Sequence, residues 1–326
     1  MRLALAIDGG NSKTDAVLVR EDGTVLATAR GAGSSPHHLG VDAALDVVGG
    51  LIAELAPAEE PAEALLLLAG VDFPYEEEAA ETAAVERGWA RRTSVRNDTF
   101  AVLRAGTDAG WGIAVTCGAG INCVGVARDG REARFPALGA ISGDWGGGND
   151  LGVEALFAAA RSEDGRGART VLETRVPAHF NVAAPSDIAQ AIHRGQLAER
   201  RLLELAPLVF ELAADDAVAA SIVARQVSEI VAMVRVTAER LRLQEEVFDV
   251  VLGGGLLQRA EPSLVAAIAQ GVHLTAPGAV VRPTAAPAIL GSALLVLDGL
   301  GADDEAKRKV RRELEGETVM IGGRDG

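Results

Sequence analysis

The chain has 326 residues, of which 48% are hydrophobic, and a net charge of −15 from 31 basic and 46 acidic side chains. The length suits two domains, and the hydrophobic content excludes a disordered chain. The acidic balance argues against a nucleic-acid partner, which would require a basic surface. The only two cysteines, Cys117 and Cys123, cannot supply a disulfide framework, so we expect small core residues in a reduced, cytoplasmic setting.

We also expect no membrane partner. The apolar start of the chain, residues 3–7, is shorter than the core of a signal peptide. Other apolar runs, such as residues 65–71, fall short of the length that crosses a bilayer.

A glycine-rich hairpin opens the chain and is repeated in its second half. Residues 3–29 predict a three-stranded meander with an Asp-Gly turn at 21–23, and residues 113–135 follow the same order. Glycine lets a backbone approach a phosphate closely and direct N–H groups towards it. Two such loops favour an enzyme that binds a polyphosphate, with ATP as the first hypothesis.

Helices and strands alternate along the rest of the chain. In the first half we expect helices at 41–56 and 76–88, strands at 65–69 and 94–96, and a helix that begins at 97–99. In the second half we expect a helix from 151, mostly helical sequence over 185–245, a strand at 247–252 followed by a helix, and a last helix over 287–300. The repeated order predicts an α/β fold of two duplicated domains, 1–110 and 111–301, with a cleft between them. In this prediction the last helix packs on the first domain, and residues 302–326 form a charged tail with a disordered end at 322–326.

Several polar side chains are candidates for chemistry. Asp98 ends a predicted strand and enters a helix, where it serves either as a general base or as a helix cap. Asp8 ends the first strand and is either a Mg²⁺ ligand or part of an Asp-Gly turn. Lys13, one of three lysines, is either a phosphate contact or an exposed strand residue. His37 and His38 are neighbours in an expected extended loop and point apart there, which makes a poor metal pair.

Further motifs have a functional and a plain structural interpretation. Residues 118–120 are either a phosphate cradle or an ordinary hairpin turn. Residues 253–255 follow a strand and either bind nucleotide at a helix N-terminus or form a tight turn. Asp144 is either a hydrogen-bond acceptor for a ligand or a turn residue, and Trp145 is either a stacking platform or a core aromatic.

These motifs, in this order, resemble the sugar kinase, Hsp70 and actin superfamily. Within it they are most similar to the BadF/BadG/BcrA/BcrD-type ATPases and their N-acetylglucosamine kinase branch. The likeness covers about residues 3–300 and rests on Asp8–Thr14, Asn97–Asp98, Gly118–Cys123, Gly139–Asp144 and Leu252–Gly255. It implies two ribonuclease H-like, or actin-like ATPase, domains.

The resemblance implies a role for each motif. It makes Asp98 the catalytic base and Asp8 the metal ligand. The ATP-binding residues that it implies are Gly9, Gly10, Asn11, Ser12, Lys13, Thr14, Thr116, Gly118, Ala119, Gly120, Gly253, Gly254 and Gly255. The sugar-binding residues that it implies are Ser35, His37, Asn97, Asp98, Asn122, Gly139, Asp144 and Trp145.

Three positions depart from the family pattern. Ser35 stands where asparagine is common, Ala119 where the family has threonine, and Trp145 where it usually has glutamate. Ala119 therefore lacks one hydroxyl donor to phosphate. All three changes fall near the implied site, so the identity of the sugar stays open.

The leading function is an ATP- and Mg²⁺-dependent kinase that phosphorylates N-acetylglucosamine at its 6-hydroxyl, with glucosamine, glucose or another hexose as alternative acceptors. A second alternative is an activator-type ATPase of a dehydratase or reductase, which needs cluster-ligating cysteines at a dimer interface. Here both cysteines lie in the phosphate hairpin. A third alternative is a non-catalytic sugar sensor. The resemblance also implies a small-molecule sugar as partner and a homodimer.

Overall fold

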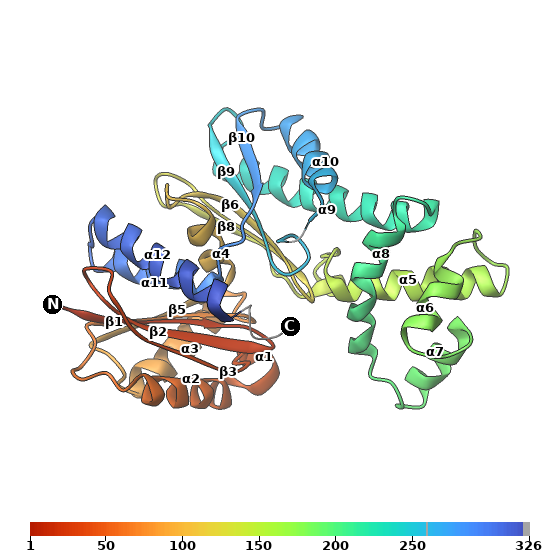
Figure 1. Ribbon diagram of the computed structural model, residues 1–326. Helices are drawn as coiled ribbons and strands as arrows, with labels where there is room; N and C mark the ends of the chain where they lie inside the picture. Colours follow the sequence, from red (N-terminus) through yellow and green to blue (C-terminus); the bar gives the residue numbers. More distant parts are fainter. Residues whose placement is uncertain (259, 322–326) are drawn as a thin grey trace. The chain divides into compact units, whose positions relative to one another are not determined.

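The computed structural model describes residues 1–258 and 260–321, which contacts divide into two compact units (Figure 1). Unit 1 comprises residues 1–114, 124–136 and the described residues from 284 onward, and unit 2 comprises 115–123 and the described part of 137–283. This division is not a single cut of the chain, so the domain limits expected from the sequence stay a prediction.

Unit 1 contains a five-stranded sheet of order β3-β2-β1-β4-β5. Its strands are β1 (Leu3–Gly9), β2 (Lys13–Arg20), β3 (Val25–Ala32), β4 (Glu63–Leu68) and β5 (Arg92–Asn97). The pairs β1–β2 and β2–β3 are antiparallel, as the predicted meander requires, while β1, β4 and β5 run parallel. Because they run parallel, these three strands end at the same edge of the sheet.

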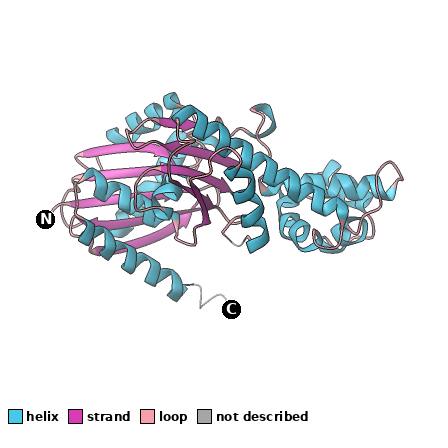
Figure 2. Ribbon diagram, turned by 90° about the horizontal axis from the view of Figure 1, so that it is seen from above, coloured by secondary structure: helices cyan, strands magenta, loops and turns pink. Residues whose placement is uncertain are grey.

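Helices cover both faces of this sheet (Figures 1 and 2). On one face α2 (Val41–Leu55) and α3 (Pro74–Glu86) pack against side chains such as Leu5 and Ile7. On the other face α4 (Thr99–Gly106), α11 (Ala288–Gly299) and α12 (Asp304–Ile321) pack against Ala4 and Ala6. A Cβ on Gly291 of α11 would lie 1.8 Å from the carbonyl oxygen of Ala101 in α4, so glycine permits this helix contact.

The segment expected to be a charged tail is mostly the helix α12. Its side chains Val310 and Leu314 are buried in the core of unit 1, and Arg311 donates to the carbonyl oxygen of Ala105 at 3.1 Å. Charged residues of both signs conceal the short apolar stripe formed by Ala306, Val310 and Leu314, which is why composition suggested a tail. The end expected to be disordered, 322–326, lies outside the described residues.

A second five-stranded sheet has the order β10-β9-β6-β7-β8. Its strands are β6 (Gly112–Cys117), β7 (Ile121–Val126), β8 (Glu132–Arg134), β9 (Phe248–Gly253) and β10 (Ala279–Pro283). The second glycine hairpin forms β6, β7 and β8, as predicted, whereas β10 was not expected. Strands β6 and β7 carry the chain from one unit into the other.

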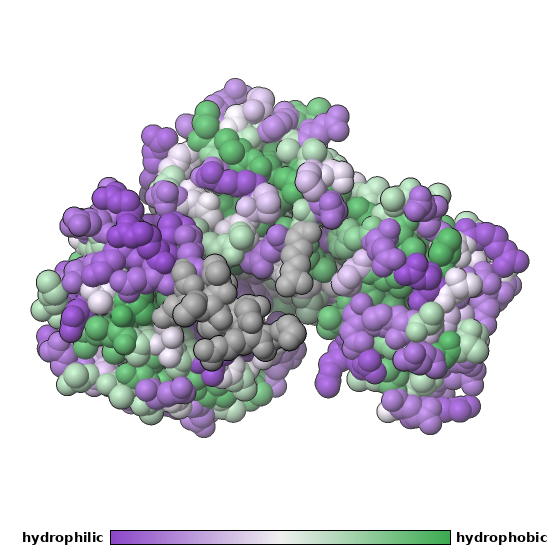
Figure 3. Space-filling view, viewed as in Figure 1, coloured by the Kyte–Doolittle hydropathy of each residue, from purple (hydrophilic) through white to green (hydrophobic). Residues whose placement is uncertain are grey.

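Unit 2 is rich in helices, as the pattern over 185–245 predicts. They are α5 (Gly148–Glu163), α6 (Leu172–His179), α7 (Pro185–His193), α8 (Ala206–Leu212), α9 (Ala217–Leu241) and α10 (Pro262–His273), with 3₁₀ turns at Gly139–Ile141 and Glu199–Leu205. A core built from α5 to α9 includes Leu151, Leu205 and Ile222. Hydrophilic side chains are spread over both units on the face seen in Figure 3.

Helix α9 is long and apolar enough to cross a membrane on length and composition alone, which differs from the expectation for the chain. It also carries charged side chains, including the pair Arg225 and Glu229. Its residues Ala219 and Ile222 are buried in the core of unit 2. A core helix can pass the same test of length and composition, so one such helix is weak evidence for a membrane span.

Candidate active site

The ends of β1 and β5 bring Asp8 and Asp98 to the same edge of the unit 1 sheet. In the ladders Gly9 pairs with Leu68, and Leu68 pairs with Asn97. Asp8 precedes Gly9 and, by the alternation of side chains, lies on the sheet face that α4 and α11 cover. Asp98 immediately precedes α4 on that face. The carboxyls are close enough for the charge of Asp98 to raise the pKa of Asp8.

Burial makes ionisation unfavourable for both carboxyls, and neighbouring negative charges add to this effect at Asp8. Burial, with the charges of Asp98 and Asp15, raises the pKa of Asp8 to about 7, against the opposing effects of Lys13 and Arg30. Burial raises the pKa of Asp98 to about 6. Neither carboxyl forms an ion pair with a residue that the structure describes, because Lys13 and Arg30 pair with Asp15 at 2.9 and 2.5 Å. Carboxyls perturbed in this way are typical of catalytic acids, bases and metal ligands.

Asn97 fixes the turn that carries Asp98. Its side-chain Nδ2 donates to Oδ1 of Asp72 at 2.8 Å, and its Oδ1 accepts the N–H of Thr99 at 2.9 Å. Its backbone N–H donates to Oε1 of Glu77 at 2.8 Å. Asp98 occupies the N-cap of α4 without a side-chain capping bond, although hydrogen bonds with Thr99 lower its pKa against the effect of burial. The direct sugar contact implied for Asn97 stays a prediction.

The first glycine loop packs tightly against the segment at residues 33–34. A Cβ on Gly9 would lie 2.4 Å from Oγ of Ser34, and one on Gly33 would lie 2.3 Å from the carbonyl oxygen of Asn11. The hydroxyl of Thr14 donates to Ser34 Oγ at 2.8 Å, and both residues are buried. Packing of the chain on itself therefore explains glycine at these positions, and the Thr14 side chain faces the interior.

The tip of this loop is open to solvent. The N–H of Gly10 donates to the carbonyl oxygen of Lys13 at 2.9 Å and closes the tip. Asn11, Ser12 and Lys13 are exposed, although the Lys13 amine pairs with Asp15. Within this motif these three side chains are the ones accessible to a phosphate.

Ser35 is buried, and its Oγ has no hydrogen-bond partner among the described residues. A Cβ on Gly70, whose φ is +76°, would lie 2.7 Å from this Oγ and 2.6 Å from Cβ of His37. Residues 36–39 form the short helix α1, so the expected extended loop is wrong. One helical step of about 100° lets the exposed rings of His37 and His38 meet edge to face, with 5.1 Å between centroids. No group of three or more potential metal ligands occurs in the described part of the chain.

In unit 2 the start of α5 holds the second glycine loop. The carbonyl oxygens of Gly118 and Ala119 accept the N–H groups of Gly148 and Asn149 at 2.8 and 2.9 Å. The N–H of Gly118 donates to the carbonyl oxygen of Gly120 at 2.9 Å, which closes the loop. These bonds fix the backbone of the loop to a helix of 16 residues.

Gly118 and Gly120 border open space. A Cβ on either residue would meet no atom of the described chain within 4 Å, and neither residue has a positive φ. The same holds for the exposed Gly255. The buried Oγ1 of the neighbouring Thr116 has no partner among the described residues. Internal packing does not explain these glycines, whereas a ligand that approaches the backbone closely would explain them.

The third glycine segment packs on the second glycine loop within unit 2. Gly253 ends β9, and Gly254, whose φ is +82°, lies so close to Cys117 that a Cβ would be 2.3 Å from its carbonyl oxygen. The same oxygen accepts the N–H of Leu256 at 3.2 Å. Helix α10 begins only at Pro262, so the helix N-terminus expected directly after the glycines is wrong, and a turn lies there instead.

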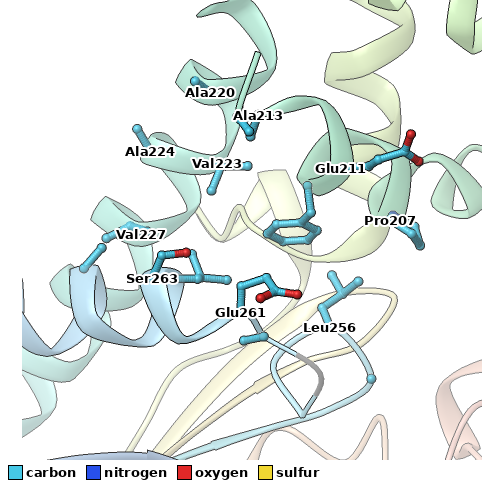
Figure 4. Close-up of a pocket in the computed structure, with 16 residues that line it drawn as sticks. Pro207, Glu211, Ala213, Ala220, Val223, Ala224, Val227, Leu256, Glu261 and Ser263 are labelled. Carbon is cyan, nitrogen blue, oxygen red and sulfur yellow. The ribbon is translucent and has the colours of Figure 1, made fainter. Parts of the chain in front are cut away.

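A cavity of about 850 Å³ lies between α8, α9 and α10, beside the third glycine segment (Figure 4). Gly255 and Leu256 border it, and Glu211 and Glu261 add carboxylates to a mostly apolar wall. The apolar lining includes Phe210, Val223, Ala224, Val227 and Leu264. This size and this mostly apolar lining are typical of small-molecule binding sites. The sequence does not reveal these lining residues, because apolar side chains at helical spacing look like ordinary core.

The expected sugar segment is held by its own turn. Asp144 is buried and accepts a hydrogen bond from Ser142 Oγ at 2.5 Å, while its N–H donates to the carbonyl oxygen of Gly139 at 3.1 Å. A φ of +70° explains glycine at position 139. The guanidinium carbon of Arg225 lies 3.9 Å from the centroid of the Trp145 ring, and Trp145 packs on the core of unit 2. One face of the indole is therefore covered by the protein.

The two cysteines are core residues, as expected. Both thiols are fully buried, and burial raises the pKa of each of them. The Sγ of Cys123 lies 3.4 Å from Oγ1 of Thr237. Between them in sequence, Asn122 accepts the N–H of Cys123 on its side-chain oxygen at 2.7 Å. The sugar contact implied for Asn122 stays a prediction.

Residues 5–296 match the model of the BadF/BadG/BcrA/BcrD ATPase family. The chain belongs to this family. It is 28% identical over 263 residues to an N-acetylmuramic acid/N-acetylglucosamine kinase from Clostridium acetobutylicum, covering 79% of this chain and 86% of that protein. It is 25% identical over 311 residues to an N-acetyl-D-glucosamine kinase from Dictyostelium discoideum, and the match covers 90% of this chain and 97% of that protein.

Solved structures agree on the fold. The structure of a Chromobacterium violaceum protein, described as a proposed N-acetylglucosamine kinase, matches with a TM-score of 0.67 and 24% identity over 91% of this chain and 99% of that chain. A ROK family glucokinase from Streptomyces griseus matches with a TM-score of 0.52 and 17% identity over 90% of this chain and 98% of that chain. The expected family and the expected α/β fold of two actin-like ATPase domains are confirmed.

Proposed function

We propose that the protein transfers the γ-phosphoryl group of ATP to a 2-acetamido sugar, with the 6-hydroxyl of N-acetylglucosamine as the favoured acceptor. The observation that carries the proposal is the pair of carboxyls with raised pKa values, Asp8 and Asp98, at one edge of the unit 1 sheet. The names of the bacterial and amoebal relatives support an acetamido sugar, and the bacterial name adds N-acetylmuramic acid as a second acceptor to test.

Asp98 is the proposed general base. It accepts the proton of the sugar hydroxyl while that oxygen forms a bond to the γ-phosphorus and the bond to the leaving ADP breaks. A pKa of about 6 makes Asp98 a stronger base than an ordinary aspartate, yet leaves it mostly ionised at pH 7.5. A positioned base contributes roughly 10²- to 10⁴-fold to the rate.

Asp8 is the proposed Mg²⁺ ligand. Its carboxylate is a hard oxygen donor, and the repulsion from Asp98 and Asp15 that raises its pKa is what a nearby divalent cation would relieve. When bound, Mg²⁺ neutralises negative charge on the phosphates during transfer. The proposed role of Asp8, at the end of β1, is to fix the position of the cation.

Unit 2 supplies the proposed nucleotide contacts. Open space beside Gly118 and Gly120 supports a phosphate cradle formed by backbone amides. The cavity bordered by Gly255 and Leu256 supports a binding place for the adenosine moiety, where apolar walls exclude water from the base. Asp144 remains the proposed partner for sugar hydroxyls, with one of its oxygens already held by Ser142.

The alternative functions have less support. An activator ATPase would need thiols that ligate a cluster at a dimer interface, and both cysteines here are buried within the protein core. A kinase for glucosamine, glucose or another hexose keeps the same base and phosphate contacts and differs in the sugar alone. A non-catalytic sensor would bind a sugar without turnover.

The test is phosphoryl transfer to a panel of sugars with ATP and Mg²⁺. The panel contains N-acetylglucosamine, N-acetylmuramic acid, glucosamine, N-acetylmannosamine and glucose, with a no-sugar control and detection of both ADP and sugar phosphate. We expect strong stimulation by an acetamido sugar. Equal ADP release without sugar, or no turnover with any sugar, would contradict the proposed function.

A further inference from the structure

Helix α9 carries a polar side chain in the middle of its buried stripe. The buried positions of this helix follow helical spacing, and at the third of them stands Gln226, which is completely buried. Its amide oxygen has no hydrogen-bond partner among the described residues. A buried amide whose oxygen lacks a partner stabilises the helix packing less than an apolar side chain would. The stability of the helix therefore does not explain glutamine at this position.

The amide nitrogen of Gln226 supplies that explanation. It donates to the carbonyl oxygen of Gly146 at 2.7 Å, across 80 positions of sequence. Gly146 has a φ of +132°, and a Cβ there would lie 3.3 Å from Ile121 and 3.5 Å from Cγ of Gln226. Gln226 therefore holds a backbone segment whose conformation favours glycine and whose surroundings leave little space.

The segment that follows Gly146 is joined directly to the second glycine loop. A Cβ on Gly147 would lie 2.3 Å from Cα of Gly120, so the two backbones are in close contact. The next two residues donate the N–H bonds to the loop carbonyls described above. Asp150 accepts the N–H groups of Gly146 and Gly147 at 3.0 and 3.1 Å. Movement of the segment 146–149 would therefore move the proposed phosphate cradle.

The same helix also borders the proposed adenosine cavity. Figure 4 shows that side of α9 facing the cavity, with Leu256 and Glu261 across from it. The α9 residues that line the cavity are Ala220, Val223, Ala224 and Val227. Gln226 therefore belongs to a helix that lines the proposed adenosine cavity. Its own hydrogen bond to Gly146 connects this helix to the second glycine loop.

We propose that Gln226 is a positioning residue that sets the phosphate loop at residues 118–120 relative to the adenosine cavity. The proposal rests on the proposed nucleotide site. It assigns to Gln226 no contact with the nucleotide, because its amide acts through the segment 146–149. Loss of the amide is expected to loosen the loop while the cavity walls stay in place.

The test compares Gln226→Met with Thr237→Val. Methionine keeps the length of the side chain and removes the hydrogen-bonding amide. Thr237 is a second fully buried polar residue of α9, which contacts Cys123 instead of Gly146. Both variants remove a buried polar group from the same helix. Only Gln226→Met also removes the hydrogen bond to the glycine segment at Gly146.

The first readout is hydrogen exchange of the nucleotide-free protein. In Gln226→Met we expect the amides of residues 118–120 and 146–149 to exchange at least tenfold faster, with α10 unchanged and Tm within about 3 °C. Thr237→Val should leave both regions at the wild-type rate. Unchanged exchange in the loop, or faster exchange spread through α10 as well, would overturn the proposal.

The second readout separates the parts of the nucleotide. For Gln226→Met we expect the Kd for AMP to stay within about threefold of wild type, while the Kd for ATP rises about tenfold. A rise that is equal for AMP and ATP would overturn the positioning role. If the wild-type protein binds no nucleotide, the proposed function itself fails, and the exchange experiment still decides whether Gln226 holds the loop.

Discussion

Two carboxyls of unit 1, Asp8 and Asp98, and two of unit 2, Asp144 and Asp150, have opposite surroundings. In unit 1, Asp8 and Asp98 lie near each other without an ion pair to a described residue, and both have raised pKa values. In unit 2, Asp144 accepts a bond from a serine hydroxyl, and Asp150 accepts two backbone N–H bonds. Asp144 and Asp150 organise turns, whereas Asp8 and Asp98 are left in a state that costs stability.

This contrast suggests that the two units have different functions. Ionisable groups with shifted pKa values are typical of residues that move protons or hold cations. Satisfied carboxyls, open glycines and an apolar cavity are typical of residues that hold a ligand in place. We therefore expect substitutions in unit 1 to change the chemical step and to leave or raise stability. Substitutions in the second glycine loop and in the cavity of unit 2 should change nucleotide affinity.

The largest effect is expected for Asp98→Asn. Without the base, kcat should fall about 10³-fold, within the usual range for general-base removal. ATP affinity, measured by calorimetry, should stay within about threefold, and Tm should not fall because a desolvated carboxylate is removed. Residual kcat within tenfold of wild type would remove Asp98 from the base role.

The pH profile adds a check on the same residue. Asp98 accepts a proton only when ionised, so kcat/KM should fall about tenfold per pH unit below its pKa of about 6. The exposed Asp108, whose side chain is 93% accessible, provides the control. Asp108→Asn should keep the wild-type rate and the wild-type profile.

A smaller effect is expected for Gly120→Ala in unit 2. The added methyl group meets no atom of the described chain within 4 Å, so Tm should stay within about 2 °C. If the open space takes phosphate, the same methyl group should raise the Kd for ATP about 10- to 100-fold. Gly50→Ala is the matched control, because Gly50 is exposed in α2 of unit 1 and also borders open space. ATP affinity that is unchanged in both variants would argue against the cradle.

Asp8→Asn is expected to stabilise the protein. A folded-state pKa of about 7, above the ordinary 3.8, means that the folded chain keeps a proton that the unfolded chain releases, so stability falls as pH rises between these values. Removal of the carboxyl should add about 1–3 kcal/mol to the free energy of unfolding at pH 8 and less than half of that at pH 5. Urea unfolding with EDTA measures this gain, and the exposed Asp42→Asn is its control. A loss of stability at pH 8 would contradict the assigned pKa shift.

The sequence predicted those parts of the site that local patterns specify. Asp8 and Asp98 were proposed from the sequence because each ends a predicted strand, and the structure places both strand ends at one edge of a parallel part of the sheet. The pattern did not reveal Gln226, since its partner is 80 positions away. It also missed the cavity, whose apolar lining comes from three helices and resembles core. Contacts between distant segments are absent from local sequence, and these contacts determine which buried residues support function.

The smallest effect is expected for Trp145→Phe. The sequence left open whether this indole stacks on a sugar or belongs to the core, and the structure places Arg225 over the ring at 3.9 Å. A phenyl ring keeps most of the packing and the interaction with the guanidinium, which is worth roughly 0.5–1 kcal/mol at a partly exposed site. We therefore expect the sugar KM to change less than threefold, with a fall in Tm of about 2–4 °C. A rise in sugar KM of tenfold or more, with Tm unchanged, would show that the second face of Trp145 contacts the sugar. Such a result would add Trp145 to Asp144 as a unit 2 residue that takes part in sugar recognition.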